Sequence, residues 1–188
     1  DARKPQRKKR AGKVATDLLT RLKQEKDSAI SGGIYHKVQI ELTYNSNHIE
    51  GSKLTHDQTR YIFETNTIGI ENEIINVDDV VETANHFRCV DLIIDKAKAM
   101  LTENFIKELH LILKNGTSDS RKEWFTVGDY KKIPNEVGGM ETALPEEVPD
   151  KIQQLLREYH SKEKKNLEDI LDFHAKFERI HPFQDGNG

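Results

Sequence analysis

The chain has 188 residues, of which 35% are hydrophobic and 32% charged, and this length suffices for one domain with a single core. Its formal net charge of −3 argues against a nucleic-acid binder. No apolar run approaches the roughly 20 residues that a membrane-spanning helix needs. We find no signal peptide at the start and a single cysteine, Cys89, so we expect a cytoplasmic protein without an internal disulfide.

The first residues are strongly basic. Residues 1–11 begin with DARKPQRKKR, and we expect them to form a solvated, disordered arm. Nothing after them indicates a repeat or a second domain, so residues 12–188 are predicted to be one domain. Within it, SGGIYH near residues 31–36 is the one candidate for a flexible join.

Helical signals follow in the first half of the chain. A helix is predicted from about residue 35 to 51, with Gly51 as its left-handed cap. Thr55 and Gln58 have the spacing of a capping box and predict a second helix over 55–65.

A long helix and a shorter one are predicted next. Asp78 or Asp79 is placed to cap the long helix, and Thr102 begins the next one, which ends near Gly116. The apolar stripe of the long helix falls at positions 80, 84, 87, 90, 94, 97 and 101.

The second half changes from helical spacing to short β-prone runs and back. Residues 125–140 (FTVGDYKKIPNEVGGM) are broken by GD, PN and GG, which predicts a hairpin or flap. Pro149 suits the first turn of another helix, and Asn166 caps a last one over 167–180. The predicted fold class is therefore all-α, a helical bundle with a small β-hairpin flap.

The closing segment, residues 181–188 (HPFQDGNG), combines a proton acceptor with a ligand for a hard metal ion. The last helix is expected to stop at His181, because Pro182 disfavours the α region for the residue before it. Histidine is the usual side chain for removing a hydroxyl proton near neutrality. The carboxylate of Asp185 suits Mg²⁺, which usually reaches a protein through one or two carboxylates plus substrate phosphates.

Glycines flank an amide in the same segment. Gly186 and Gly188 allow backbone angles closed to other residues and let a ligand approach the main chain, while Asn187 tolerates a left-handed conformation. Such a loop can present several N–H groups to a phosphate. Together, the parts of this segment indicate transfer of a phosphate-containing group to a hydroxyl.

The string HPFQDGNG is similar to the signature of the Fic (filamentation induced by cAMP) domain family, whose pattern is HPFx(D/E)GNGRxxR. The resemblance implies a protein adenylyltransferase, which moves AMP from ATP to a serine, threonine or tyrosine hydroxyl of a target protein, with Mg²⁺ as cofactor. It implies that His181 is the general base and Asp185 the magnesium ligand. The residues implied at the nucleotide are Phe183, which also anchors the loop in the core, Gly186, Asn187 and Gly188.

Two arginines of the family pattern fall beyond Gly188. By resemblance, their guanidinium groups would bind the nucleotide's phosphates as a charged fork. We therefore expect the chain to be a fragment, truncated within the motif, and we treat the predicted function as that of the parent domain.

Upstream, SNHIEG over residues 46–51 resembles the family's inhibitory motif (S/T)xxxE(G/N). The resemblance implies that Ser46, Glu50 and Gly51 form an inhibitory helix end. Glu50 would reach into the nucleotide site, pair with the second arginine of the pattern and keep ATP from binding productively. The residues alone also allow these positions simply to finish a helix, and the two interpretations are compatible.

The flap fits the same family. Its members carry a flap here that holds the target segment as an added strand, through main-chain hydrogen bonds. Tyr130, Lys131 and Ile133 are the candidates for contacts to nucleotide or target, and an ordinary surface hairpin is the alternative.

Other functions remain open at this point. His174, Glu178 and His181 recur at steps of four and three on one helical face, a spacing that also suits a transition-metal site but leaves the glycine loop unexplained. Family members also transfer other phosphate-containing groups or remove AMP from a modified protein. A catalytically silent module that binds a partner on its flap is a further alternative. A homo-oligomer is compatible with the sequence.

Overall fold

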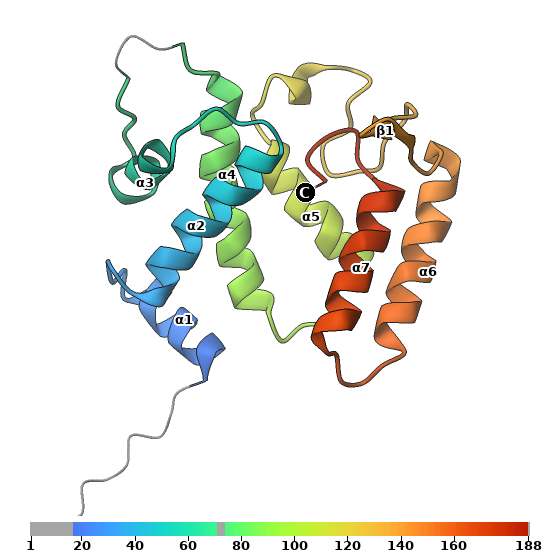
Figure 1. The fold of residues 1–188 in the computed structure, drawn as a ribbon, viewed down its shortest axis with the longest axis horizontal. Coiled ribbons are helices and arrows are strands. Elements are labelled where there is room, and N and C mark those ends of the chain that lie inside the picture. The colour runs from blue at the N-terminus through green and yellow to red at the C-terminus, as the bar shows by residue number, and fades with distance from the viewer. Residues whose placement is uncertain (1–16, 71–73, 188) are drawn as a thin grey trace, which may run out of the picture.

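The computed structural model describes residues 17–70 and 74–187, so the predicted basic arm (1–11) and Gly188 lie outside the described residues. The described chain is a bundle of α-helices with one small two-stranded sheet, which confirms the predicted fold class (Figure 1). None of the described helices is long and apolar enough to cross a membrane. In chain order, the elements are α1 Leu18–Asp27, α2 Ile34–Ile49, α3 His56–Thr65, α4 Val77–Lys96, α5 Glu103–Lys114, β1 Glu136–Val137, β2 Met140–Glu141, α6 Val148–His160 and α7 Leu167–Ile180.

Most predicted helix starts are confirmed, because side chains satisfy the free amide groups of the first turn. The Thr55 hydroxyl accepts from the Gln58 amide at 3.1 Å, and the Gln58 side chain accepts from the Thr55 amide at 2.9 Å. Thr102 accepts from the Phe105 amide at 3.2 Å at the start of α5, and Asn166 caps α7. Each such cap contributes about 1 kcal/mol.

The long helix α4 differs from its prediction at both ends. It begins at Val77, because the side chain of Asn76, and not Asp78 or Asp79, accepts from a first-turn amide, at 3.1 Å. It ends before Leu101, which packs on the core from the connection to α5. Apolar spacing alone does not distinguish such a loop residue from a further helical turn. Helix α1 has no counterpart among the predicted elements.

The predicted flap is a hairpin, but it is shorter than expected and lies at the C-terminal end of the predicted range. Strands β1 and β2 pair antiparallel, with Val137 opposite Met140. Gly138 and Gly139 join them with φ angles of 58° and 77°, and only residues that tolerate positive φ suit such a turn. Residues 125–135 are irregular, because several of their side chains turn into the core instead of alternating between two faces.

Helix α5 stands between two groups of helices (Figure 1). On one side α6 and α7 pack together, and on the other α2, α3 and α4 do. The apolar stripe of α7 is buried only toward its end, since Ile180 is 8% exposed and Ile170 is 50% exposed. The main core cluster contains Ile106, Tyr130, Ala143, Val148, Ile152, Leu155, Leu156, Ile180 and Phe183. Ile180 at the end of α7 and Ile106 of α5 therefore belong to one core cluster.

Helix α2 lies on α4 through polar side chains that recur every fourth residue and so share one helical face. This stripe consists of Tyr35, Gln39, Thr43 and Asn47. Its bonds to α4 include Gln39 Nε2 to Asp91 Oδ1 (2.8 Å), Thr43 Oγ1 with His86 Nδ1 (2.8 Å) and Asn47 Nδ2 to Thr83 Oγ1 (2.9 Å). Gln39 and Thr43 are fully buried, so these bonds are shielded from water. They fix α2, from Gln39 to Asn47, beside α4.

Candidate active site

Helix α7 ends where the proline predicts, and the residue that follows it is His181. This residue has φ 49° and ψ 66°, a left-handed conformation that costs a residue with a side chain about 1–2 kcal/mol. Its amide still donates to the carbonyl of Phe177 at 2.9 Å. Burial, and then the charge of Lys131, lowers the pKa of His181 below its ordinary value. The imidazole is therefore neutral at neutral pH, which is the form a general base needs.

The loop after His181 is anchored from below by Phe183, which is 2% exposed. Its ring stacks on that of His110, with centroids 4.0 Å apart and planes 3° from parallel. The Asn187 side chain closes the loop, because it accepts from the Phe183 amide at 2.7 Å and donates to the Phe183 carbonyl at 3.0 Å. Both side chains, and the backbone amide and carbonyl of Phe183, are thus engaged within the protein.

A buried lysine holds Asp185 in place. Lys114, at the end of α5, is 1% exposed, and its Nζ donates to Asp185 Oδ2 at 2.8 Å and to Glu82 Oε1 at 2.6 Å. Burial alone would lower the pKa of Lys114, but its bonds to the two carboxylates raise it above its ordinary value. For Asp185 the same bond outweighs burial and lowers the pKa. At neutral pH this ammonium therefore links the loop to α4 and α5 as a charged group.

Gly186 packs against the same lysine. It has φ 70°, and a Cβ built on it would lie 3.0 Å from Lys114 Cδ and 3.4 Å from Leu113 Cδ2. The position therefore requires glycine for its backbone angle and for the space around it.

The segment before the hairpin is tied to the loop at two points. His110 Nε2 lies 3.1 Å from the Asp185 carbonyl, and His110 Nδ1 lies 2.8 Å from the Gly128 amide. Since an amide only donates, Nδ1 accepts and Nε2 carries the proton of a neutral ring. Burial lowers the pKa of His110 to about 4, which agrees with that state. At the second point, the Lys131 amide donates to the Pro182 carbonyl at 2.9 Å.

Two of the three predicted flap contacts have inward-facing side chains. Tyr130 is 8% exposed and packs near Phe183, with ring centroids 5.8 Å apart. Lys131 is 3% exposed, its Nζ donates to Asn135 Oδ1 at 2.6 Å, and burial lowers its pKa to about 8. Ile133 is 44% exposed. Of these three side chains, that of Ile133 is the one at the surface.

The two sequence motifs meet at a small polar pocket of about 30 Å³. Helix α2 brings residues of SNHIEG to it, and the loop after α7 brings Asp185 and Gly186. Gly51, just beyond the pocket, has φ 99°, so the predicted left-handed residue after α2 is present. The pocket is lined by Ser46, Asn47, Glu50, Glu82, His86, Leu113, Asp185 and Gly186. Three carboxylates thus share one enclosed space.

The residues present fit a magnesium ion held mainly by its substrate. In residues 17–70 and 74–187, no three Asp, Glu, His or Cys side chains form a group that could hold a metal ion. The alternative site at His174, Glu178 and His181 is accordingly not formed, because His181 leaves the helix in a left-handed conformation. The Asp185 side chain is 51% exposed with one oxygen bound by Lys114. One accessible carboxylate suits Mg²⁺, which keeps water and phosphate as its other ligands.

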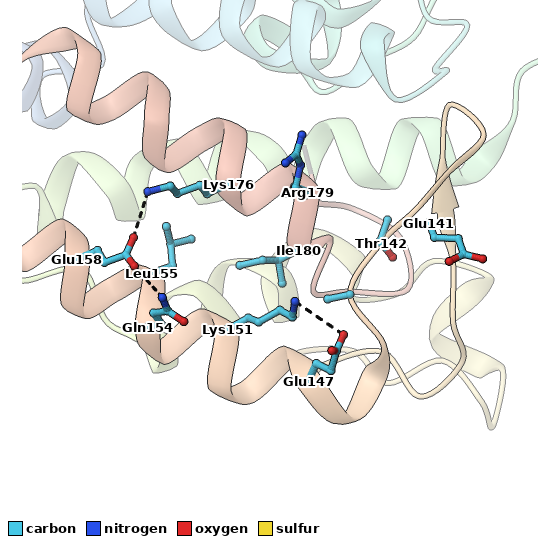
Figure 2. Close-up of a pocket in the computed structure, with 11 residues that line it drawn as sticks. Glu141, Thr142, Glu147, Lys151, Gln154, Leu155, Glu158, Lys176, Arg179 and Ile180 are labelled. Atoms are coloured by element: carbon cyan, nitrogen blue, oxygen red, sulfur yellow. Dashed lines mark hydrogen bonds and ion pairs between the residues drawn. The ribbon is translucent and has the colours of Figure 1, made fainter.

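Two larger pockets flank the loop. One, of about 280 Å³, lies against Gly186 and Asn187 and is mostly apolar, so it does not suit phosphate groups. The other, of about 450 Å³, lies between α6, α7 and the hairpin (Figure 2). Its wall includes Glu141, Thr142, Lys151, Glu158, Lys176, Arg179 and Ile180. Because Ile180 directly precedes His181, this second pocket runs from the hairpin to the end of α7.

Two side chains that shape the loop are missing from the predicted site. His110 and Lys114 follow Ile106 at steps of four, on the face of α5 that is buried. The sequence does contain a signal for them, because a polar residue at a position where the helical spacing predicts a core residue is unusual. It is a weak signal for Lys114, because a lysine in the last turn of a helix also complements the helix dipole.

Comparison with known proteins agrees with the motif and the fold. A model of the Fic/DOC family matches residues 100–188. A Fic domain containing signaling protein from Bacteroides thetaiotaomicron has 28% identity and a TM-score of 0.70, with 90% of this chain and 67% of that chain covered. A Fic family protein from Desulfovibrio desulfuricans has 21% identity and a TM-score of 0.68, with 87% and 48% covered. A segment of Fic-1 from C. elegans has 18% identity and a TM-score of 0.64, with 90% and 52% covered.

No curated protein matches the sequence. The chain spans about two-thirds of the length of the first of these structures and about half of the other two. The likeness to those two shows the fold alone. Residues 100–188, which include HPFQDGNG, are therefore similar to the Fic/DOC family, and the described chain has the fold of a Fic domain.

Proposed function

We propose that the protein to which this chain belongs is a protein adenylyltransferase, which moves AMP from ATP to a hydroxyl side chain of a target protein. The match of residues 100–188 to the Fic/DOC family supports a Fic-type domain. One observation carries the finer proposal: a neutral, half-buried His181 stands beside a glycine loop whose Asp185 is kept ionised by Lys114. A base, a fixed carboxylate and accessible backbone amides are the groups that such a transfer requires.

In the proposed reaction, the hydroxyl oxygen of the target attacks the α-phosphorus of ATP, and the bond from that phosphorus to pyrophosphate breaks. His181 takes the proton of the hydroxyl, and AMP remains bound to the target oxygen. Asp185 would hold Mg²⁺, which when bound neutralises charge on the phosphates. The anchored loop keeps His181 and Asp185 at a fixed separation, so little reorganisation accompanies the reaction.

The target is proposed to lie along the hairpin. An extended segment that pairs with a strand of the hairpin would pass the pocket between α6 and α7 on its way to His181 (Figure 2). Ile133 lies at the surface near this path, and its amide is 3.3 Å from the Gln184 side-chain oxygen of the motif loop. Exposed cations and carboxylates on the pocket wall, among them Lys176 and Glu158, would contact polar side chains of the target.

Inhibition by Glu50 is proposed from the small pocket that both motifs line. Glu82 and Asp185 share one ammonium, that of Lys114, and Glu50 adds a further carboxylate to the pocket lining, which opposes the phosphates of ATP unless a cation enters with them. Moving Glu50 out of the pocket would lower this barrier. A glutamate at this position can also activate water, so removal of AMP from a modified target is the second activity to test.

The test uses full-length protein with Mg²⁺ and ATP labelled on the α-phosphate. We expect label on protein hydroxyls, faster labelling with Glu50→Gly, and loss of labelling by a factor of about 100 or more with His181→Ala, because a general base contributes about that much. ATP affinity should stay nearly unchanged in His181→Ala, since the base acts on the acceptor. Labelling that survives His181→Ala would refute the proposal, and label released from a pre-modified target would favour the reverse reaction.

A further inference from the structure

We propose that Glu178 is a positioning residue for His181, whose carboxylate holds the imidazole so that Nδ1 carries the proton and Nε2 is left to accept one. The inference rests on the proposed function, because it assigns a partner to the base of that reaction. It makes His181 and Glu178 a pair that acts together, with only His181 touching the substrate.

The first support is an imidazole and a carboxylate that lie close together, each with one buried polar atom that lacks a hydrogen bond. Glu178 Oε2 lies 3.9 Å from His181 Nδ1. Among the described residues, His181 Nδ1 and Glu178 Oε1 belong to the few buried polar atoms that lack a hydrogen-bond partner. Buried polar groups are nearly always bonded, so such a pair calls for an explanation. Catalytic hydrogen bonds are often long before substrate binds, and a closure of about 1 Å would form this one.

The second support is the backbone. Glu178 lies in the last turn of α7, and residues three apart on a helix share a face. His181 has left the helix with φ 49°, yet its Nδ1 still lies 3.9 Å from Glu178 Oε2. The next residue, Pro182, accepts from the Lys131 amide at 2.9 Å, which fixes the left-handed exit from outside the helix. A strained conformation that the surroundings hold in this way often marks a functional constraint.

The third support is the charge balance around the pair. Burial raises the pKa of Glu178, and His174 acts against this effect. Burial and Lys131 lower the pKa of His181, while the Glu178 backbone carbonyl and Asp185 act to raise it. The imidazole is thus neutral at rest. When it accepts the hydroxyl proton, an ion pair forms with Glu178, so the carboxylate stabilises the transition state more than the ground state.

The activity test compares Glu178→Ala and Glu178→Gln with Glu168→Gln, a control at an exposed carboxylate in the first turn of the same helix. In full-length protein we expect Glu178→Ala to lower kcat by about tenfold to a hundredfold, part of what a general base supplies, with KM for ATP unchanged. Glu178→Gln keeps an acceptor oxygen without the charge, so its loss should be smaller. The control should match the unmodified protein.

A second measurement determines which nitrogen of the His181 imidazole carries the proton. Nitrogen-15 NMR of the histidine rings in the 188-residue chain, with His181 assigned by His181→Gln, should show a proton on Nδ1 of His181. Free histidine prefers the proton on Nε2, and we expect Glu178→Ala to move His181 toward that form. If Glu178→Ala does not fold, the kcat of Glu178→Gln and the ring signal of the unmodified chain decide the question.

The outcomes separate the two proposals. If His181→Ala loses transfer while Glu178→Ala keeps its full kcat and the same protonated nitrogen on His181, only the positioning role is overturned. The orientation of the imidazole would then be assigned to the backbone carbonyl of Glu178. Transfer that persists in His181→Ala would remove the proposed function itself, whatever Glu178 does.

Discussion

Two helix ends face the same small pocket, and they are held in different ways. The end of α7 leads into a loop that is bonded to residues far away in the sequence, since Lys114 and His110 both bind Asp185. The end of α2 has mostly local backbone bonds, since the Gly51 amide donates to His48 and the Ser52 amide to Asn47, although the Lys53 amide also donates to Asp79 of α4. A Cβ on Gly51 would meet no atom within 4 Å, whereas one on Gly186 would meet the Lys114 side chain.

The difference separates a helix end that is bonded to several elements from one that has fewer long-range bonds. A loop tied to several elements can keep His181 in a costly backbone conformation, because its surroundings determine the geometry. A helix end that is exposed and locally bonded can shift at small free-energy cost. Within the proposed function, this suits Glu50, which must leave the pocket for ATP to enter, and it predicts different sensitivities to mutation at the two ends.

The largest effect is expected at the lysine that ties the catalytic end. Lys114→Met would leave Glu82 and Asp185 without their shared cation, and we expect a loss of about 2–3 kcal/mol, less than for a fully buried pair because the Asp185 side chain is 51% exposed. Lys96→Met is the matched control, because Lys96 also joins α4 to α5, through Glu108, but is 42% exposed. Its cost should stay below about 1 kcal/mol. Chemical denaturation of both variants measures this, and similar losses would contradict the comparison.

Low pH should lower the free energy of unfolding, because one buried histidine near each of the two helix ends becomes protonated when the chain unfolds. Burial lowers the pKa of His110, at the loop, and of His86, under α2, to about 4. Unfolding restores values near 6.5, so the unfolded chain binds protons first. The stabilisation, on the order of 3 kcal/mol for each, is therefore complete above about pH 6.5 and is lost as the pH falls toward 4. Denaturation between pH 7 and 4 tests this, and His110→Gln should give a flatter curve than the unmodified chain.

The glycines after the two helices should respond unequally to alanine. Gly51→Ala meets only the cost of a left-handed angle, about 1 kcal/mol. Gly186→Ala adds the contact with Lys114 at 3.0 Å, and we expect a total near 2 kcal/mol. Thermal unfolding of the two variants compares them directly. An equal shift in Tm would show that the loop relaxes around the added methyl group.

The smallest predicted effect has the opposite sign. His181→Gly removes the cost of a side chain at φ 49° and should stabilise the fold by up to about 1 kcal/mol, while it abolishes transfer. The greater freedom of glycine in the unfolded chain offsets part of this gain. A lower stability in this variant would mean that the imidazole contributes packing that outweighs the backbone strain.

Much of the fold could be predicted from the sequence because it depends on local signals. The capping residues Thr55, Thr102 and Asn166 mark helix starts, and Pro182 marks the end of α7. The end of α4 could not be predicted, because Leu101 continues an apolar spacing from outside the helix. Helix α1 offers few apolar residues that recur at helical steps, and one of its residues, Glu25, is buried through a bond to the Tyr35 amide.

The sequence allowed the chemical roles of the site residues to be predicted, but few of the contacts that position them. The motif names His181 and Asp185 and indicates what each can do. It does not reveal that Lys114 binds Asp185 across 71 positions of sequence, or that His110 does so across 75. The inward position of Lys131 was equally hidden, because a lysine in a hairpin-like stretch usually points to water.

The bond between Lys114 and Glu82 also bears on the order of events in folding. It joins α4 to α5, and the motif loop can dock only on the surface that these helices form together. We therefore predict that α4 and α5 pack together before the motif loop docks, so that the loop is a late region of the folding pathway. By the same logic, amide protons of residues 183–187 should exchange with solvent through partial openings that leave α4 and α5 intact.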